Sequence, residues 1–252
     1  MKVLVIFGSP RKKNSYFVTK ALETELKKLG EVEFEYLFLK DIDLATCIGC
    51  HNCLFFGESK CPLPDNVNNV LEKMLTSNGL IFVSPVYVSH VTGLMKNFID
   101  RFSFLCHRPQ LFRQDLLVIS TTGIMGLKDV LNYMESVSQT WGARSVTKLG
   151  IVTPPDKTAE EITNDPQIRQ AALRFYKKLN KAAWSPSLKQ VIQFQAQKTF
   201  LTSAQASKFS PKDYEHYKKL QDKSFNVPAK ITLWKRVIGK IVSLIVKLSS
   251  KG

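Results

Sequence analysis

The sequence predicts an α/β protein built on a doubly wound parallel sheet of five strands, with a helical extension at its C-terminal end. Short apolar runs alternate five times with segments of helical periodicity over the first 180 residues. Most of these runs carry few polar residues, as strands do when both faces of a parallel sheet are buried. After Trp184 the pattern changes to a polar stretch rich in Lys and Gln.

The predicted strands and helices follow one another in regular order. Residues 2–7 are an unbroken apolar run that leads into Gly8-Ser9-Pro10, and residues 32–39 alternate apolar with acidic side chains. Three later apolar runs predict the remaining strands, at residues 79–84, 116–120 and 146–152. Helical periodicity predicts helices at residues 15–29, 65–76, 93–105, 126–141 and 158–183. Ligands of such sheets lie beyond the carboxyl ends of the strands, so the loops after the first, third and fourth strands are the candidates for a site.

The chain divides into a predicted body and two C-terminal segments. We expect the α/β domain to span residues 1–184, a helical arm residues 185–229, and a basic amphipathic helix residues 230–252. The net charge of +15 is unevenly placed, since residues 181–252 hold 14 Lys and Arg against 3 Asp and Glu. Nucleic acid, anionic lipid and an acidic protein are each a partner that this positive charge could bind.

Several features predict a cytoplasmic protein that is soluble or peripheral to a membrane. The apolar start is too short for a signal sequence and no small-residue cleavage site follows it, so we interpret it as the first strand. No run of about 18 apolar residues is free of charge, which argues against a spanning helix. Four of the five cysteines fall between Cys47 and Cys61, an intracellular metal or redox pattern more than a disulfide framework.

The loop after the first strand predicts a phosphate site. It reads Gly-Ser-Pro-Arg-Lys-Lys-Asn-Ser and joins a buried strand to the start of a helix, where free backbone N–H groups and the positive end of the helix dipole favour an anion. Ser9, Asn14 and Ser15 are short donors, and Arg11 can pair with phosphate oxygens. The loop lacks the Walker and dinucleotide glycine patterns, so a monophosphate is expected. The alternative is a capped helix start with solvated basic side chains.

The loops after the third and fourth strands predict a site for a flat heteroaromatic ring. Residues 84–93 combine backbone donors with the side chains of Val86 and Tyr87, against which a ring can lie. Residues 121–126 add small side chains and two glycines, which allow a close approach of the backbone. The alternative for residues 84–93 is a strand end closed by Pro85 and packed by Tyr87.

The cysteine motif has the spacing Cys-x2-Cys-x2-Cys-x7-Cys and predicts a metal centre at Cys47, Cys50, Cys53 and Cys61. Gaps of two residues let consecutive thiolates converge on one centre, and four soft ligands suit an iron-sulfur cluster or zinc. Nearby His51 leaves a mixed zinc site open as well. The third alternative is a set of reduced thiols that are structural or redox-active.

Together these motifs resemble the flavodoxin-like NAD(P)H-dependent FMN reductases, and within them the iron-sulfur flavoproteins. The resemblance spans roughly residues 1–180 and is carried by Gly8-Ser9-Pro10-Arg11 with Asn14-Ser15, by the four motif cysteines, by Ser84-Pro85-Val86-Tyr87 and by Lys96-Asn97-Phe98-Ile99-Asp100-Arg101. Asp65 stands alone where relatives often carry paired acids. We expect Asp100 and Arg101 to form a structural ion pair.

The resemblance implies where an FMN cofactor would lie. It implies that four side chains hold the FMN phosphate, namely Ser9, Arg11, Asn14 and Ser15. It implies that the ring lies beside Pro85, Val86, Tyr87, Val88, Thr122 and Gly123. It also favours a [4Fe-4S] cluster on the cysteine motif, and it implies a homodimer or homotetramer in which a neighbouring subunit completes the flavin pocket.

The C-terminal segment, residues 230–251, has the pattern of an amphipathic helix. Trp234, Ile238, Ile241, Ile245 and Leu248 repeat at helical spacing, and basic residues gather opposite. Such a helix can lie in an anionic membrane surface. The alternative is a helix that packs on the body or on a second subunit. Nucleic acid is not expected as a partner, because no aromatic residues are interleaved with the positive charge.

The functional hypothesis is an FMN-dependent oxidoreductase in which FMN accepts electrons from NAD(P)H or a reduced carrier such as ferredoxin. A cluster on the cysteine motif would relay single electrons, and the flavin would pass them to a quinone, an oxygen species or another small acceptor. No catalytic side chain is predicted, because the cofactor supplies the chemistry. The alternatives are an electron-carrier flavoprotein without turnover of its own, or a flavin protein whose cysteine loop binds zinc or carries only thiols.

Overall fold

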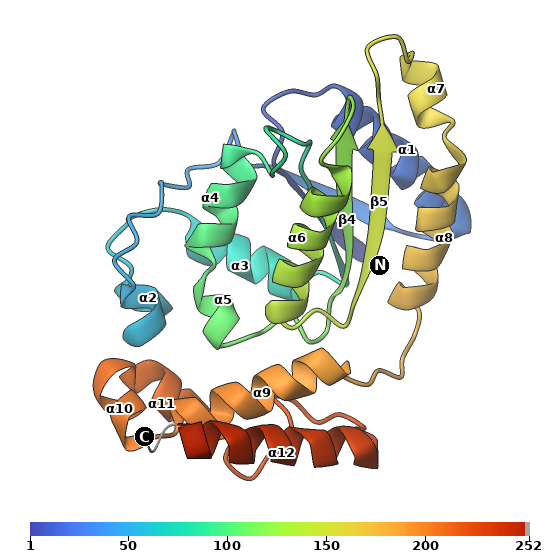
Figure 1. The fold of residues 1–252 in the computed structure, drawn as a ribbon. Coiled ribbons are helices and arrows are strands. Elements are labelled where there is room, and N and C mark those ends of the chain that lie inside the picture. Colours follow the sequence, from blue (N-terminus) through green and yellow to red (C-terminus); the bar gives the residue numbers. More distant parts are fainter. Residues whose placement is uncertain (250–252) are drawn as a thin grey trace.

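A computed structural model describes residues 1–249 and shows a five-stranded parallel sheet in the order β2-β1-β3-β4-β5 (Figure 1). The strands are β1 (Lys2–Phe7), β2 (Glu33–Phe38), β3 (Gly79–Val83), β4 (Asp115–Thr122) and β5 (Ser145–Val152). Val3 of β1 is in register with Phe34 on one side and Gly79 on the other. The predicted doubly wound sheet is confirmed, and all five strands fall within two residues of the ranges predicted from the apolar runs.

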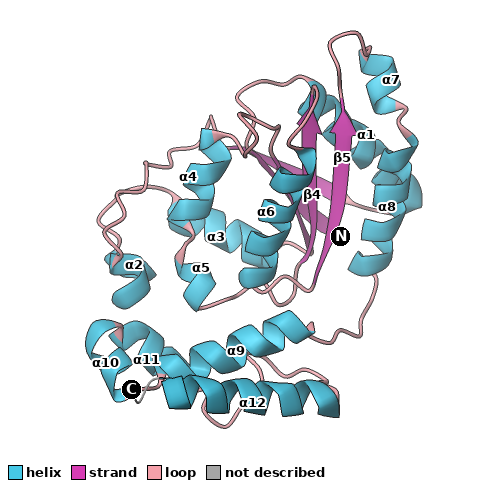
Figure 2. Ribbon diagram, viewed as in Figure 1, coloured by secondary structure: helices cyan, strands magenta, loops and turns pink. Residues whose placement is uncertain are grey.

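Helices cover both faces of the sheet, as Figure 2 shows. One face is covered by α1 (Asn14–Leu29) and α8 (Pro166–Leu179), and the other by α3 (Val67–Thr76), α4 (Gly93–Arg101) and α6 (Leu127–Thr140). Within β1 the side chains of Val3 and Val5 pack in the core under α1 and α8. Those of Leu4 and Ile6 pack in the core on the opposite face, under α3, α4 and α6. Side chains alternate across a strand, so a central strand buried on both faces must be apolar throughout.

Two predicted helices are interrupted in the structure. The helix expected at residues 158–183 is divided into α7 (Ala159–Thr163) and α8, because Pro166 has no N–H for an interior helical bond and begins a new helix instead. The Asp165 side chain caps α8 by accepting a hydrogen bond from the backbone N–H of Gln167 at 3.0 Å. The helix expected at residues 93–105 stops at Arg101, and α5 (Phe104–His107) follows it.

The cysteine motif lies on a long connection between β2 and α3. Its regular structure is one short helix, α2 (Asn52–Phe55), and a 3₁₀ turn at Glu58–Lys60. This connection packs beside α4 and α5 (Figure 1).

The C-terminal part of the described chain is a set of four helices with buried residues of its own. The helices are α9 (Leu188–Leu201), α10 (Ala204–Phe209), α11 (Pro211–Lys218) and α12 (Leu233–Ser249), and their core includes Val191, Phe194, Tyr217 and Phe225. Gln190 on α9 donates a hydrogen bond to the carbonyl of Ala143 at 2.9 Å, just before β5 begins. The arm therefore lies at the end of the body where the strands start (Figure 1).

Candidate functional site

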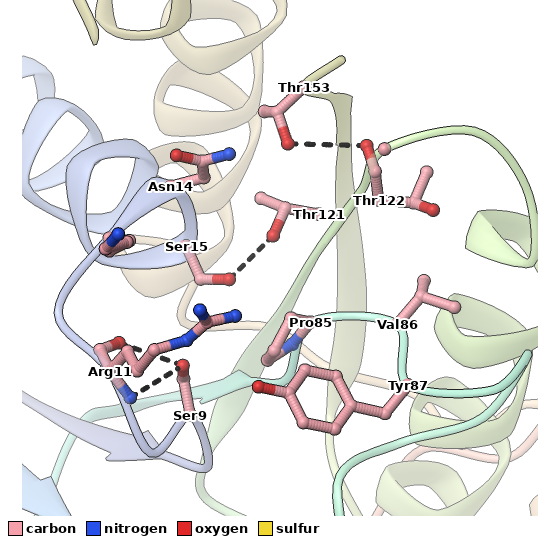
Figure 3. Close-up of a pocket in the computed structure, with 12 residues that line it drawn as sticks. Ser9, Arg11, Asn14, Ser15, Pro85, Val86, Tyr87, Thr121, Thr122 and Thr153 are labelled. Atoms are coloured by element: carbon pink, nitrogen blue, oxygen red, sulfur yellow. Dashed lines mark hydrogen bonds between the residues drawn. The ribbon is translucent and has the colours of Figure 1, made fainter. Parts of the chain in front are cut away.

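A pocket opens at the carboxyl ends of β1, β3, β4 and β5, and Figure 3 shows it from close by. Its volume is about 200 Å³. The loops after these strands supply its lining, which consists of Ser9, Arg11, Lys13, Asn14, Ser15, Pro85, Val86, Tyr87, Thr121, Thr122, Gly123 and Thr153. This is the edge at which a doubly wound sheet binds its ligands.

One end of the pocket is the amino terminus of α1. The helix starts at Asn14, its first turn holds no acidic residue, and no side chain within residues 1–249 caps it. The N–H groups of Tyr16 and Phe17 bond to the Lys13 carbonyl at 2.7 and 3.0 Å, whereas those of Asn14 and Ser15 belong to the orphan donors of a helix start. The helix dipole adds positive charge at this point, so the geometry favours an anion.

Short hydrogen bonds fix the side chains around this helix terminus. Ser9 Oγ donates to the Arg11 carbonyl at 2.9 Å and accepts from the Arg11 N–H at 3.3 Å, which closes the turn after β1. Ser15 Oγ lies 2.6 Å from Thr121 Oγ1, so α1 is tied directly to the end of β4. Because both hydroxyls are buried, the floor of the pocket is polar and held in place.

The other end of the pocket is an apolar and aromatic wall. Pro85, Val86 and Tyr87 follow β3, and the N–H of Val86 bonds to the Thr121 carbonyl at 2.9 Å. Figure 3 shows the Tyr87 ring beside Pro85 and facing the Arg11 side of the pocket. An anion site and a flat apolar wall thus share one opening, as a phosphorylated aromatic ligand requires.

The opposite rim is formed by residues after β4 and β5. Thr122 Oγ1 donates to the Met125 carbonyl at 2.6 Å, and the N–H of Thr153 donates to the Thr122 carbonyl at 2.7 Å. Gly123 follows Thr122 in the sequence, and a Cβ built on Gly123 would meet open space. Nothing in the described chain therefore fills the rim at Gly123, where a ring can approach the backbone closely.

The structure brings together nine of the ten residues predicted to hold the cofactor. The exception is Val88, which is not among the residues that line the pocket. It is fully exposed at the tip of a turn, with φ at +47°, because Tyr87 and His90 pair on either side of it. Three further residues line the pocket, namely Lys13, Thr121 and Thr153. Lys13 and Thr121 lie in loops predicted to form the site but were not predicted as contacts, whereas Thr153 follows the fifth strand, whose loop was not among the predicted ones.

The residues present fit the polar and flat parts of FMN. The fit is seen in the uncapped start of α1, the buried hydroxyls of Ser9 and Ser15, and the free space at Gly123. The volume of about 200 Å³ is below the roughly 300–1,000 Å³ usual for a ligand pocket. The described residues therefore enclose only part of such a ligand.

The four motif cysteines lie on the connection between β2 and α3 but do not form a metal site in this structure. Among residues 1–249, no three His, Cys, Asp or Glu side chains lie close enough together to hold a metal ion. Cys50 is exposed, and Gly49 beside it has a positive φ and open space around it. A cluster does not fit the loop as it stands, and binding one would require residues 47–61 to change conformation.

The environments of the cysteines differ. Burial raises the pKa of the Cys53 thiol, a contact with Ser103 at 3.9 Å opposes this, and the three neighbouring motif thiols raise the pKa further. Cys61 accepts a hydrogen bond from the guanidinium of Arg101 at 3.0 Å. The backbone N–H of Cys47 donates to Asn97 Oδ1 at 3.0 Å. The loop is thus anchored to α4 at two of its cysteines.

The expected pairing of Asp100 with Arg101 is not the one that the structure shows. Arg101 Nη2 contacts both carboxylate oxygens of Asp65 at 2.7 Å, and both side chains are almost fully buried. Asp100 instead pairs with Lys96, one helical turn away. Adjacent residues on a helix point in different directions, whereas residues i and i+4 lie on one face. The single acid at Asp65 therefore has a structural role, because its carboxylate also accepts from the N–H of Ala45 at 2.9 Å.

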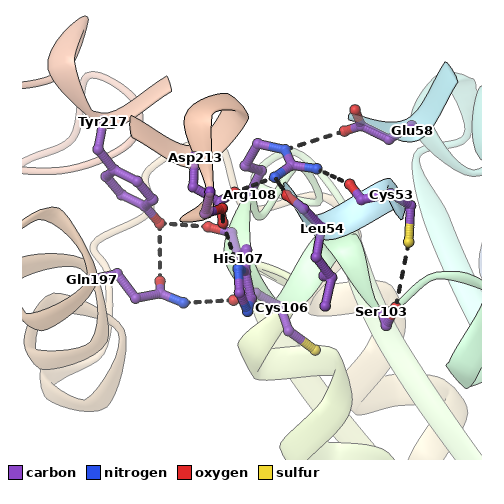
Figure 4. A network of polar contacts seen from close by, with 11 residues as sticks. Cys53, Leu54, Glu58, Ser103, Cys106, His107, Arg108, Gln197, Asp213 and Tyr217 are labelled. Atoms are coloured by element: carbon purple, nitrogen blue, oxygen red, sulfur yellow. Dashed lines mark hydrogen bonds and ion pairs between the residues drawn. The ribbon is translucent and has the colours of Figure 1, made fainter. Parts of the chain in front are cut away.

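A second buried ion pair joins Arg108, at the end of α5, to Asp213 of the C-terminal arm, as Figure 4 shows. The Arg108 guanidinium donates to the carbonyls of Cys53 and Leu54 at 2.6 and 2.9 Å and pairs with Asp213 of α11. Burial opposes ionisation of Asp213, but hydrogen bonds from His107 and Ser210, both at 2.6 Å, lower the pKa of its carboxyl. The arm thus fixes Arg108, and Arg108 fixes the backbone of the cysteine loop.

Comparison with known proteins gives a family match over the first 154 residues, to the model of the NADPH-dependent FMN reductases. An iron-sulfur flavoprotein of Archaeoglobus fulgidus is 42% identical over 101 residues, which are 40% of this chain and 48% of that protein. An iron-sulfur flavoprotein of Clostridioides difficile is 28% identical over 226 residues, which are 88% of this chain and 97% of that protein. The aligned parts thus range from about half to nearly all of the relatives' length.

Solved structures share the fold at low sequence identity. An NAD(P)H:quinone oxidoreductase from Methanothermobacter marburgensis superimposes with a TM-score of 0.55 at 21% identity, covering 68% of this chain and 98% of that one. RosB with a bound 8-demethyl-8-formylriboflavin-5'-phosphate intermediate gives a TM-score of 0.59 at 13% identity, covering 72% and 81%. These likenesses establish the flavodoxin-like arrangement of the sheet.

Proposed function

The chain belongs to the NADPH-dependent FMN reductase family, on the branch of the iron-sulfur flavoproteins, and on that premise we propose that it is an FMN-dependent oxidoreductase. The observation that carries the proposal is the uncapped amino terminus of α1, which opens into the same pocket as the wall of Pro85, Val86 and Tyr87. When bound, FMN supplies hydride acceptance and one-electron transfer. The protein supplies position, charge and access.

In this proposal the α1 end of the pocket holds the phosphate. The backbone N–H groups of Asn14 and Ser15 donate to its oxygens, the Ser9 hydroxyl lies at the same turn, and the Arg11 guanidinium neutralises its charge. The bond between Ser15 and Thr121 keeps the helix start in register with β4, so that the donors need little rearrangement on binding.

The ring end of the pocket orients the flavin. Pro85, Val86 and Tyr87 give one face of the ring an apolar surface, and Thr122 and Gly123 bring backbone groups to its polar edge. The pocket of about 200 Å³ leaves part of a flavin uncovered by one subunit. We therefore propose a homodimer or homotetramer in which a neighbouring copy covers the rest.

The proposed electron donor is NAD(P)H or a reduced carrier such as ferredoxin, and the proposed acceptor is a quinone, an oxygen species or another small molecule. The family assignment supports the nicotinamide donor. The test is steady-state oxidation of NADPH and NADH by the protein loaded with FMN. Turnover that depends on bound FMN supports a reductase. No oxidation of either nicotinamide would leave an electron-carrier flavoprotein, the alternative function.

A [4Fe-4S] cluster at Cys47, Cys50, Cys53 and Cys61 is a separate proposal. The spacing of the cysteines and the names of the sequence relatives support it, whereas the conformation of the loop does not. Visible absorbance with iron and sulfide analysis of anaerobically purified protein tests it, and zinc analysis of the same sample tests the zinc alternative. Four titratable thiols without metal would leave the third alternative.

We propose that the chain is organised in the three segments predicted from its sequence. Residues 1–184 would form the flavin-binding domain, residues 185–229 the arm, and residues 230–252 the basic C-terminal segment. The helix of that segment is α12, and residues 250–252 lie outside the described residues. The reduced cysteines favour a cytoplasmic location. Among the residues described, no helix combines the length and the apolar character needed to cross a bilayer.

A further inference from the structure

The helix α12 packs on the arm with the side that carries the buried Gly239, and half-buried side chains flank this glycine, namely Lys235, Ile238, Val242, Ser243 and Val246. Gly239 is its buried residue, and a Cβ there would lie 3.0 Å from the side chain of Gln195 on α9. Ser243 donates a hydrogen bond to Gln195 at 3.3 Å, and Lys235 donates to the Pro186 carbonyl at 2.7 Å. The contact with the protein therefore uses the side of the helix opposite to its exposed large apolar residues.

Those large apolar residues face solvent. Seven of them are between 49% and 77% exposed, namely Leu233, Trp234, Val237, Ile241, Leu244, Ile245 and Leu248. At 100° per residue they span about 120° of the helix circumference, centred opposite Gly239. The row is continuous along a helix that is about 25 Å long. A soluble protein rarely leaves such a patch uncovered unless the patch is an interaction surface.

The charges beside this row are of one sign. Arg236, Lys240 and Lys247 lie along one edge of it, and the sequence from residue 230 to residue 249 holds no Asp or Glu. Residues 181–252 as a whole hold 14 Lys and Arg against 3 Asp and Glu. A surface that accepts the apolar row must also accept this positive charge.

We propose that the outer face of α12 docks on an anionic lipid surface, with the helix axis in the plane of the membrane. An apolar arc of this width with basic residues at its edge is the pattern of an interfacial helix, and Trp234 near its start suits the boundary between headgroups and acyl chains. A second copy of the chain is disfavoured as the occupant. Pairing two of these faces would place two strongly basic arms against each other, and juxtaposed like charges oppose association.

Docking in this way orients the whole molecule. The arm meets the body where the strands begin, and the pocket lies where they end (Figure 1). The pocket consequently faces the aqueous phase, away from the lipid. The docking itself does not depend on flavin chemistry, so it can be measured whether or not the pocket binds FMN.

The experiment is cosedimentation of the full chain with vesicles of phosphatidylcholine alone and of phosphatidylcholine with 30% phosphatidylglycerol, on the order of physiological surface charge. We expect binding only to the anionic vesicles, decreasing as salt is added. Charge reversal by Arg236→Glu with Lys240→Glu is expected to weaken partitioning at least about tenfold. The matched control, Arg169→Glu with Arg174→Glu on α8, makes the same change in net charge and is expected to alter it less than about threefold.

A second readout places the helix at the lipid without relying on charge variants. Fluorescence of Trp234 in the unaltered chain is expected to be quenched by brominated phosphatidylcholine in the anionic vesicles, and the quenching is expected to be lost in Trp234→Phe. Circular dichroism confirms that each variant is folded. Absence of sedimentation with anionic vesicles would overturn the proposal. So would a dimer in light scattering that Ile241→Asp dissociates, because a second copy would then cover the face.

Discussion

Removing the buried carboxylate of Asp65 is predicted to destabilise the protein strongly. In the structure this carboxylate accepts two contacts from Arg101 at 2.7 Å and one from the N–H of Ala45 at 2.9 Å. The exposed fractions of the Arg101 and Asp65 side chains are 3% and 1%. In Asp65→Asn the guanidinium stays buried and loses its counter-charge.

The magnitude follows from the desolvation of the remaining charge. Breaking a buried ion pair by removing one partner costs about 3–5 kcal/mol. For a chain of this size that corresponds to a decrease in Tm of about 6–20 °C. The neighbouring exposed pair of Lys96 and Asp100 is the matched control, and Asp100→Asn is expected to cost less than about 1 kcal/mol.

The assay is urea unfolding at pH 7, followed by circular dichroism, of Asp65→Asn, Arg101→Met and the double variant. Since each single variant leaves one group unpaired, the double variant is expected to be more stable than the sum of the two losses predicts, by about 1–3 kcal/mol. The reasoning is refuted if Asp65→Asn costs no more than Asp100→Asn. Strict additivity in the double variant would refute it equally.

Three further predictions concern the arm and the pocket. Asp213→Asn removes the partner charge of Arg108 and should weaken its hydrogen bonds to the cysteine loop. Cys53 should then react faster with a thiol reagent, measured in a Cys50→Ser background, and an unchanged rate would contradict this. Burial and the nearby Arg108 charge lower the pKa of His216, so the folded state disfavours its proton, and stability should fall as the pH drops below about 6.5. His216→Gln should flatten the dependence of Tm on pH between about 7 and 5.5, and an identical slope would show that another group is responsible. Arg11→Ala should weaken FMN binding about 10- to 100-fold, measured by flavin fluorescence, because a charge-assisted contact is lost; affinity equal to that of the unaltered chain would remove Arg11 from the site.

Much of the fold could be predicted because the signals are local. The strand β1 is apolar throughout since both of its sides are buried, and that pattern is visible in the sequence. The break before Pro166 was also encoded locally, but the long helical periodicity of residues 158–183 concealed it. The edge at which the site lies follows from the topology of a parallel sheet, which is why loops far apart in the sequence could be grouped correctly.

The features that could not be predicted from the sequence depend on contacts between residues far apart in the chain. The pairing of Arg101 with Asp65 joins α4 to the end of the cysteine loop, and nothing in the sequence around either residue indicates it. The pairing of Arg108 with Asp213 spans more than a hundred positions. The amphipathic pattern of residues 230–251 predicted a helix with an apolar face, but only the packing of Gly239 on α9 shows that this face points outward.

The most direct test of the account is a titration of the apoprotein with FMN and, in parallel, with riboflavin, followed by flavin fluorescence. If the amino terminus of α1 grips the phosphate, FMN should bind at least about a hundredfold more tightly than riboflavin, which lacks that group. Equal affinity for the two flavins, or no binding of FMN supplied in excess, would contradict the central claim.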